Sequence, residues 1–160
     1  MGRDRPSVLR SLRSKWSEAV SQCQVVLIED NPADVFLVQL ALKENDVPCK
    51  ITMFNNGEEA LSVLCPPEGA EPNTFVPDAI LLDLNTPKSD GFSVLIRLRE
   101  APRLAHVPIA IITSSQATSD KDRISRLGAI RYIQKPSQLE AFLSTVGQAV
   151  KEMLGAKRRG

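Results

Sequence analysis

The chain of 160 residues has the usual length of a single globular domain. Its hydrophobic fraction of 42% is ordinary for a globular protein, and its aromatic fraction of 4% indicates a core built from Leu, Ile and Val. No apolar run approaches the roughly 18 residues that a membrane span requires. The N-terminus lacks the apolar segment of a secretory signal. We therefore expect a cytoplasmic location and no membrane partner.

The formal net charge of +1 is unevenly distributed along the chain. Residues 1–22 and residues 151–160 each carry a net charge of +3, so the residues between them are net acidic. Short basic ends usually serve solubility, and nucleic acid is therefore not an expected partner. The three cysteines are odd in number and show no metal-ligand spacing, which favours thiols in a reducing compartment over a disulfide framework.

Strand-like and helix-like segments alternate after a leading amphipathic segment. A helix is expected over residues 7–20, because apolar side chains recur there on one stripe at 3.6-residue spacing. The stripe consists of Val8, Leu9, Leu12, Trp16, Ala19 and Val20. The expected strands span 24–28, 50–54, 79–82, 109–112 and 130–134. The expected helices begin at Asn31-Pro32 and stop at 45–48, span 58–64 and 92–100, run from Thr118 or Ser119 to Gly128, and run from Leu139 to about Leu154.

Strand followed by helix, repeated five times, predicts one α/β domain. We expect a doubly wound, five-stranded parallel sheet of (βα)5 type with right-handed crossovers, helices on both faces and an extra N-terminal helix. The expected divisions are a basic extension at 1–22, a folded domain at 23–154 and a basic tail at 155–160. Residues 65–77 contain four prolines and one glycine and are expected to form a loop, either with a role in binding or as passive surface.

Polar side chains follow four of the five apolar strands, where parallel sheets carry their ligand chemistry. They are Glu29 and Asp30 after the first strand, Asp83 after the third, Thr113 after the fourth and Lys135 after the fifth. Three adjacent carboxylates repel one another unless a cation lies among them. Oxygen ligands suit octahedral Mg²⁺ or Mn²⁺ rather than zinc, and a carboxylate can itself act as a nucleophile. The pattern therefore predicts phosphoryl transfer with a divalent cation.

These residues, in this order along the chain, resemble those of a response regulator receiver domain of two-component signalling. The resemblance implies a flavodoxin-like fold. The resemblance covers about residues 23–154, and the ordered set is more specific than any single motif. It rests on Glu29-Asp30 with Pro32-Ala33-Asp34, Asp83 with Pro87 and Asp90-Gly91, Thr113-Ser114-Ser115, and Tyr132 with Lys135-Pro136.

The resemblance implies a role for each matching residue. Asp83 is expected to accept phosphate from a sensor histidine kinase, and Thr113 and Lys135 to hold the phosphoryl oxygens. Tyr132 would be the switch aromatic that moves inward with Thr113. The metal would be bound by Asp30 and Asp83, by the backbone carbonyl of Asn85, and by Glu29 mainly through metal-bound water. The Lys135–Pro136 bond is expected to be cis.

Two features separate the chain from the common family pattern. Glu29 stands where Asp is more usual, which lengthens that arm and keeps its charge. The insertion at 65–77, the pair Leu84-Asn85 and a standalone layout resemble the small regulators that partner bacterial phytochromes. A phytochrome is therefore an expected kinase partner.

Other functions make different demands on the same positions. A haloacid-dehalogenase-like phosphatase would need an acid two positions after the nucleophile, where this chain has Asn85, so turnover of an external substrate is not expected. No segment after the last expected helix is long enough for an output domain, so signalling through altered homodimer or partner contacts is expected. A phosphate sink or relay shuttle is the alternative, and back-transfer from Asp83 to a histidine phosphotransfer protein would distinguish it.

Overall fold

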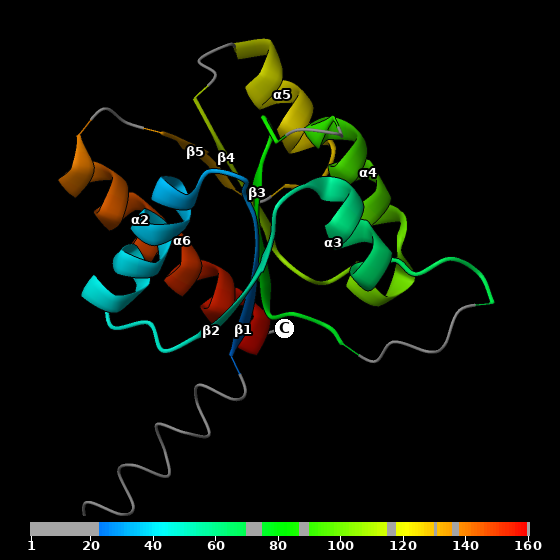
Figure 1. The fold of residues 1–160 in the computed structure, drawn as a ribbon, viewed down its shortest axis with the longest axis horizontal. Helices are drawn as coiled ribbons and strands as arrows, with labels where there is room; N and C mark the ends of the chain where they lie inside the picture. The colour runs from blue at the N-terminus through cyan, green and yellow to red at the C-terminus, as the bar shows by residue number, and fades with distance from the viewer. Residues whose placement is uncertain are drawn as a thin grey trace, which may run out of the picture.

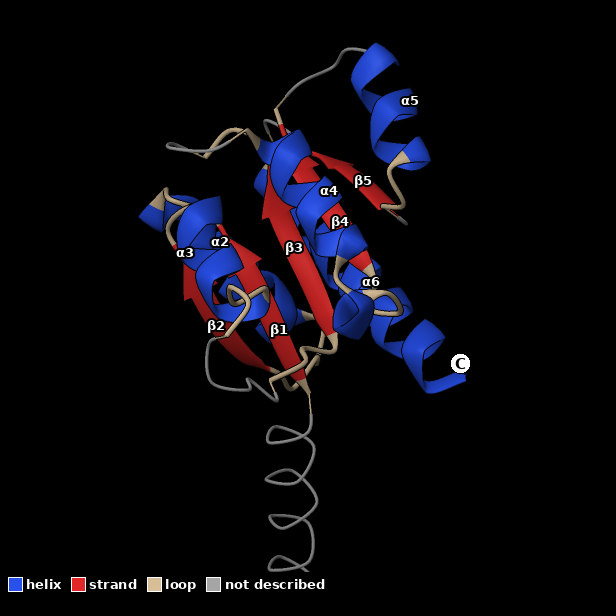
Figure 2. Cartoon of the chain, turned by 90° about the vertical axis from the view of Figure 1, so that its right-hand side faces the viewer, coloured by secondary structure: helices blue, strands red, loops and turns tan. Residues whose placement is uncertain are grey.

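A computed structural model describes residues 23–69, 75–86, 90–114, 118–129, 131–135 and 138–159. The strands form one parallel sheet in the order β2-β1-β3-β4-β5, which confirms the expected α/β architecture (Figure 1). Their arrows all point the same way in Figure 2. The strands are β1 (Gln24–Ile28), β2 (Lys50–Phe54), β3 (Ala79–Asp83), β4 (Ile109–Thr113) and β5 (Arg131–Gln134). The helices are α2 (Pro32–Glu44), α3 (Gly57–Leu64), α4 (Gly91–Glu100), α5 (Thr118–Arg126) and α6 (Leu139–Arg159), with a 3-10 turn η1 (Pro102–Leu104).

Each central strand is buried on both faces, because helices cover the sheet from two sides. Helices α2 and α6 lie on one face, and α3, α4 and α5 lie on the other (Figure 1). Successive strand side chains point to opposite faces. On β1, for example, Val25 and Leu27 pack with the α2 and α6 side chains, whereas Val26 and Ile28 pack with those of α3 and α4. Unbroken apolar runs are therefore what this sheet requires.

The helix starts are set by polar caps in the loops that follow the strands. The side-chain oxygens of Asn31, Asn56 and Asp90 accept hydrogen bonds from backbone N–H groups in the first turns of α2, α3 and α4. These caps begin α3 and α4 at Gly57 and Gly91, one residue earlier than the apolar pattern indicates. Helices α2, α3 and α4 thus start close to the carboxyl ends of the strands.

The helix α6 is longer than its apolar stripe predicts. It continues to Arg159 rather than ending near Leu154, because the added residues include good helix formers and no proline. Residues 102–104, between α4 and β4, form η1. The expected helix at 7–20, part of the 65–77 loop (70–74) and Pro136, with its expected cis bond, lie outside the described residues. No described helix is both long and apolar enough to cross a membrane.

The loops after β1 and β3 leave the sheet in opposite directions. The chain passes from β1 to α2 on one face, and from the neighbouring β3 to α4 on the other face. The carboxyl ends of two strands whose connections diverge in this way are the usual ligand position in a sheet of this kind. The polar residues singled out in the sequence lie at this edge.

Candidate functional site

Two buried carboxylates lie side by side where β1 and β3 end. The ladder pairs Ile28 with Leu82, so Glu29 and Asp83 occupy adjacent positions just beyond it. Each is only 3% exposed. The exposed carboxylate of Asp30 completes the group, and one oxygen from each of these three acids lies within 4.8 Å of the others. The sheet therefore brings together the three acids expected from the sequence.

The ammonium group of Lys135 reaches this group from the end of β5. Its Nζ lies 3.0 Å from Glu29 Oε1 and 3.2 Å from Asp83 Oδ2. The backbone N–H of Lys135 donates to the Thr113 carbonyl at 2.8 Å and continues the β4–β5 ladder past its last strand residue. The alternation of side chains then places Lys135 on the same sheet face as Ile133, the face covered by α2 and α6.

A fourth carboxylate, Asp34, belongs to the site and was not singled out as a site residue in the sequence. Its Oδ2 lies 2.7 Å from Lys135 Nζ, the shortest of the three Lys135 ion pairs. Asp34 lies in the first turn of α2, which begins two residues after Asp30. An acid at that position, with Asn31-Pro32 starting a helix directly after Glu29-Asp30, was the available signal.

Burial and neighbouring charges shift the pKa values of Glu29 and Lys135, and both pKa values are raised. The pKa of Glu29 is raised to about 8, because burial and the hydrogen bond and charge of Asp83 outweigh the opposing effect of Lys135. Burial by itself lowers the pKa of Lys135, but the hydrogen bond that its ammonium donates to Asp34 and the charges of Asp83 and Glu29 outweigh it and raise that pKa above the usual lysine value. The site thus holds excess negative charge that one ammonium group does not fully compensate.

The loop after β3 wraps around Asp83 and connects it to β4. The backbone N–H of Asn85 donates to Asp83 Oδ1 at 3.0 Å, and the side-chain Nδ2 of Asn85 donates to Thr113 Oγ1 at 3.2 Å. The Thr113 side chain is fully buried. Asn85 was expected to contribute only its backbone carbonyl, so the side-chain bond is a structural addition. It connects the Thr113 hydroxyl to the loop that carries Asp83 and Asn85.

Helix α4 approaches this loop so closely that only glycine fits at its first position. A Cβ on Gly91 would lie 2.6 Å from the Cα of Leu84 and 2.8 Å from its carbonyl oxygen. Real side chains do not tolerate such distances, so Gly91 is needed to let α4 and residue 84 pack together. Because Leu84 lies between Asp83 and Asn85, this contact sets the path of the site loop.

Tyr132 lies on β5, away from the acids but on the same ladder as Thr113. The ladder pairs Tyr132 with Ile111 and Gln134 with Thr113, so Tyr132 is displaced from Thr113 by two positions. Side chains two positions apart share a face, which places Thr113 and Tyr132 on the side covered by α5. Lys121 Nζ of α5 lies 5.2 Å from the centre of the Tyr132 ring.

The acidic group fits a hard divalent cation. Its ligand atoms are all carboxylate oxygens, which Mg²⁺ and Mn²⁺ prefer, and Cys or His is absent from the group. Oxygens around an octahedral Mg²⁺ at about 2.1 Å are themselves about 3 to 4 Å apart. The observed oxygens lie within 4.8 Å of one another, so little rearrangement is needed. Glu29, Asp30 and Asp83 thus form a candidate metal site.

Comparisons with known proteins agree on one family. The model of the response regulator receiver domain matches residues 25–147. Response regulator Rcp1 of Synechocystis sp. is 32% identical over 122 residues, which cover 76% of this chain and 82% of Rcp1. The crystal structure of the phosphorylated cyanobacterial phytochrome response regulator RcpA has a TM-score of 0.74 at 34% identity, covering 84% of this chain and 95% of that one. The Mn²⁺-bound form of Rcp1 has a TM-score of 0.73 at 30% identity, covering 82% and 94%.

These matches span the whole sheet and all of the polar residues that follow its strands. Receiver domains bind a divalent metal and take phosphoryl groups from histidine kinases, in keeping with the acidic group found here. The chain belongs to the response regulator receiver domain family of two-component signalling.

Proposed function

We propose that Asp83 accepts a phosphoryl group from the phosphohistidine of a sensor histidine kinase. A carboxylate oxygen of Asp83 forms the new P–O bond as the P–N bond to the donor imidazole breaks, and the imidazole leaves with that electron pair. The observation that carries this proposal is the position of Asp83, buried at the end of β3 between two other carboxylates and the ammonium of Lys135. The ammonium of Lys135, together with a cation bound among the carboxylates, would offset the charge of an incoming phosphoryl group.

Four residues are proposed to hold Mg²⁺ or Mn²⁺, namely Glu29, Asp30, Asp83 and the backbone carbonyl of Asn85. The bound cation would neutralise the negative charge that approaches Asp83 with the phosphoryl group. Lys135 and Thr113 are proposed to bind phosphoryl oxygens, the first through its ammonium and the second through its hydroxyl. To do so, Lys135 must exchange part of its contact with the carboxylates for contact with the phosphoryl group.

The chemical step is tested by intact-protein mass after incubation with acetyl phosphate and Mg²⁺. We expect a gain of one phosphoryl group that requires the metal and is lost in Asp83→Asn. A matched control is Asp122→Asn, which removes an exposed carboxylate on α5 and should leave the gain unchanged. Persistence of the gain in Asp83→Asn would assign the acceptor to another residue and contradict the proposal.

The signal is proposed to leave through contacts of the chain with another copy of itself or with a partner. Thr113 and Tyr132 share one face of the β4–β5 ladder, so a shift of the Thr113 hydroxyl toward a phosphoryl oxygen would change the space available to the Tyr132 ring. Sedimentation velocity with and without phosphorylation tests the homodimer. An unchanged sedimentation profile together with unchanged affinity for the partner on phosphorylation would contradict this output.

The kinase is proposed to be a phytochrome. The support is the likeness to RcpA, described as a cyanobacterial phytochrome response regulator, at 34% identity over 84% of this chain. The test is phosphotransfer from a purified phytochrome kinase under red and far-red light, with a histidine kinase that is not a photoreceptor as the control. Equal transfer from both kinases at equal autophosphorylation would contradict the assignment.

A further inference from the structure

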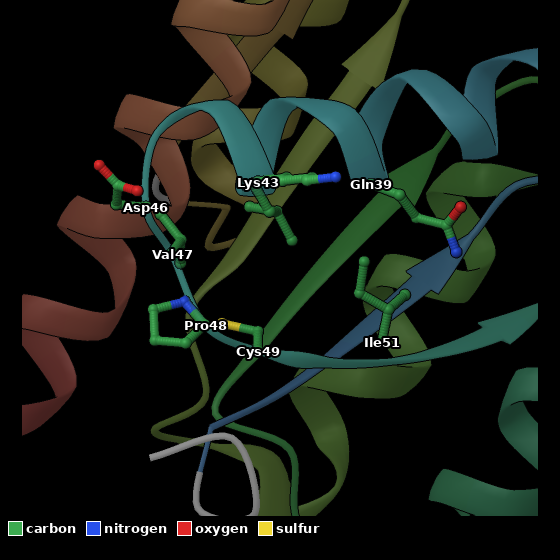
Figure 3. Close-up of a pocket in the computed structure, with 8 residues that line it drawn as sticks. Gln39, Lys43, Asp46, Val47, Pro48, Cys49 and Ile51 are labelled. Carbon is green, nitrogen blue, oxygen red and sulfur yellow. The ribbon is translucent and has the colours of Figure 1, made fainter. Parts of the chain in front are cut away.

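A hollow of about 520 Å³ lies between α2 and β2, near the end of α2 that is remote from the acidic group. Figure 3 shows Gln39 and Lys43 at the hollow from α2, Pro48 and Cys49 from the chain that leads into β2, and Ile51 from β2 itself. Strand β2 is the end strand of the described sheet, so no further described strand covers this edge. None of the lining residues belongs to the proposed phosphoryl site.

The surface beside the hollow is unusually apolar for a solvent-facing edge. Phe36 of α2 is 61% exposed and Met53 of β2 is 50% exposed. The Gln39 side-chain nitrogen lies 4.0 Å from the Met53 sulfur and connects the helix to the strand. Phe36, Gln39 and Lys43 recur three and four residues apart, so they form one stripe of α2 that faces past the sheet edge. Exposed apolar side chains gathered beside a hollow are typical of a surface covered by another segment.

The N-terminal segment joins the described chain next to this hollow. The backbone N–H of Lys50 donates to the carbonyl of Cys23 at 2.9 Å, so Cys23 lies beside the start of β2. Cys49, which lines the hollow, directly precedes Lys50. Residues 1–22 are therefore tethered within a few residues of the hollow. A short tether of this kind gives a local concentration on the order of millimolar.

The N-terminal segment is long enough to cover the hollow, and its apolar stripe suits the exposed apolar side chains beside it. Its apolar stripe runs from Val8 to Val20, and as a helix the part from Leu9 onward would span about 17 Å. From Phe36 to Glu44 the surface of α2 spans about 12 Å, and residues 46–49 and Ile51 line the hollow beyond the end of the helix. We propose that residues 7–20 form a helix whose apolar stripe packs into the hollow and against Phe36 and Met53. The proposed occupant of the hollow is thus the chain's own N-terminal segment.

Trp16 provides a direct test, because it is the single tryptophan of the chain and lies on the proposed contact stripe. In the full chain its emission should be blue-shifted, and acrylamide should quench it several-fold less efficiently than in a free peptide of residues 1–22. Gln39→Arg and Met53→Glu should each abolish the blue shift and the protection from acrylamide, since each places a charge at an exposed position in or beside the hollow. The matched control is Leu139→Glu, which changes an apolar residue that is also 50% exposed but lies on α6. Trp16 emission in the full chain like that of the free peptide would overturn the proposal. So would emission that Gln39→Arg and Met53→Glu leave unchanged.

Alkylation of Cys49 gives a second readout that does not depend on Trp16. Leu12→Asp should disrupt the stripe and speed labelling of Cys49 several-fold, while labelling of Cys65, which lies outside the hollow, should not change. Circular dichroism confirms that each variant is folded. A blue shift that appears only as protein concentration rises, together with dimer in sedimentation, would place the segment on a second copy and overturn the intramolecular contact. Independence of concentration supports it.

Discussion

Lys135 lies closer to Asp34 than to either buried carboxylate at the ends of β1 and β3. The Nζ–Oδ2 distance to Asp34 is 2.7 Å, against 3.0 Å to Glu29 and 3.2 Å to Asp83. The first turn of α2 is thereby attached to the last strand of the sheet. Both partners of this pair are partly exposed, so solvent screening limits its contribution to stability.

Replacing Asp34 should therefore destabilise the metal-free protein only moderately. We expect Asp34→Asn to lower the free energy of unfolding by about 1 kcal/mol, because the ion pair with Lys135 is lost while the helix start is kept. Urea denaturation without divalent metal measures the effect. Asp122→Asn, on an exposed face of α5, is the control and should leave the urea midpoint unchanged. Equal midpoints for Asp34→Asn and the wild type would show that the pair contributes nothing.

Removal of the Lys135 charge should make the protein depend more strongly on metal. In metal-free buffer we expect Lys135→Ala to cost about 2 kcal/mol, less than a fully buried pair because the lysine side chain is 21% exposed. The remaining carboxylates repel one another, so added Mg²⁺ should raise the melting temperature more than it does in the wild type. Lys135→Arg keeps the charge and is the control. Identical Mg²⁺ increments in Lys135→Ala and wild type would contradict a shared acidic site.

A methyl group at Gly91 should disturb both stability and the site loop. We expect Gly91→Ala to lower the free energy of unfolding by about 2 kcal/mol, because its Cβ would overlap the backbone of Leu84. Phosphoryl gain at Asp83 should slow as well, since Leu84 carries the loop next to it. The contrasting variant is Gly155→Ala in α6, where an added Cβ would have open space around it. It should stabilise the helix by about 0.5 to 1 kcal/mol, and the same sign for both variants would refute the steric argument.

The thiol of Cys65 should titrate at higher pH in the folded chain than in the unfolded chain. Burial raises its pKa, and the charges of Arg97 and Arg103 offset this only in part. Since the thiolate is the reactive form, the iodoacetamide rate at Cys65 should keep rising at pH values where the rate in urea has levelled off. Peptide mass spectrometry over a pH series measures this. Coincident profiles in buffer and in urea would rule out the shift.

The fold and the position of the site could be predicted because both follow from short stretches of sequence. Five unbroken apolar runs identify the buried strands, and the residue after each run must lie at the edge where parallel strands end. This was enough to place Glu29, Asp83 and Lys135 together. Side-chain contacts between distant elements carry no such local pattern, so the Asp34–Lys135 pair and the bond from the Asn85 side chain to Thr113 required the structure. The extension of α6 beyond Leu154 was missed for a different reason, because its last turn has no apolar stripe.

The ion pair between Glu29 and Lys135 joins residues that are 106 positions apart. During synthesis the acids at the ends of β1 and β3 are complete long before the lysine leaves the ribosome. Contacts of such separation require closure of a large loop, whose entropy cost is met only after the intervening strands have formed. A nascent chain that stops short of β5 would carry the acceptor carboxylate without its ammonium partner. The full charge arrangement around Asp83 is thus among the last features of the molecule to form.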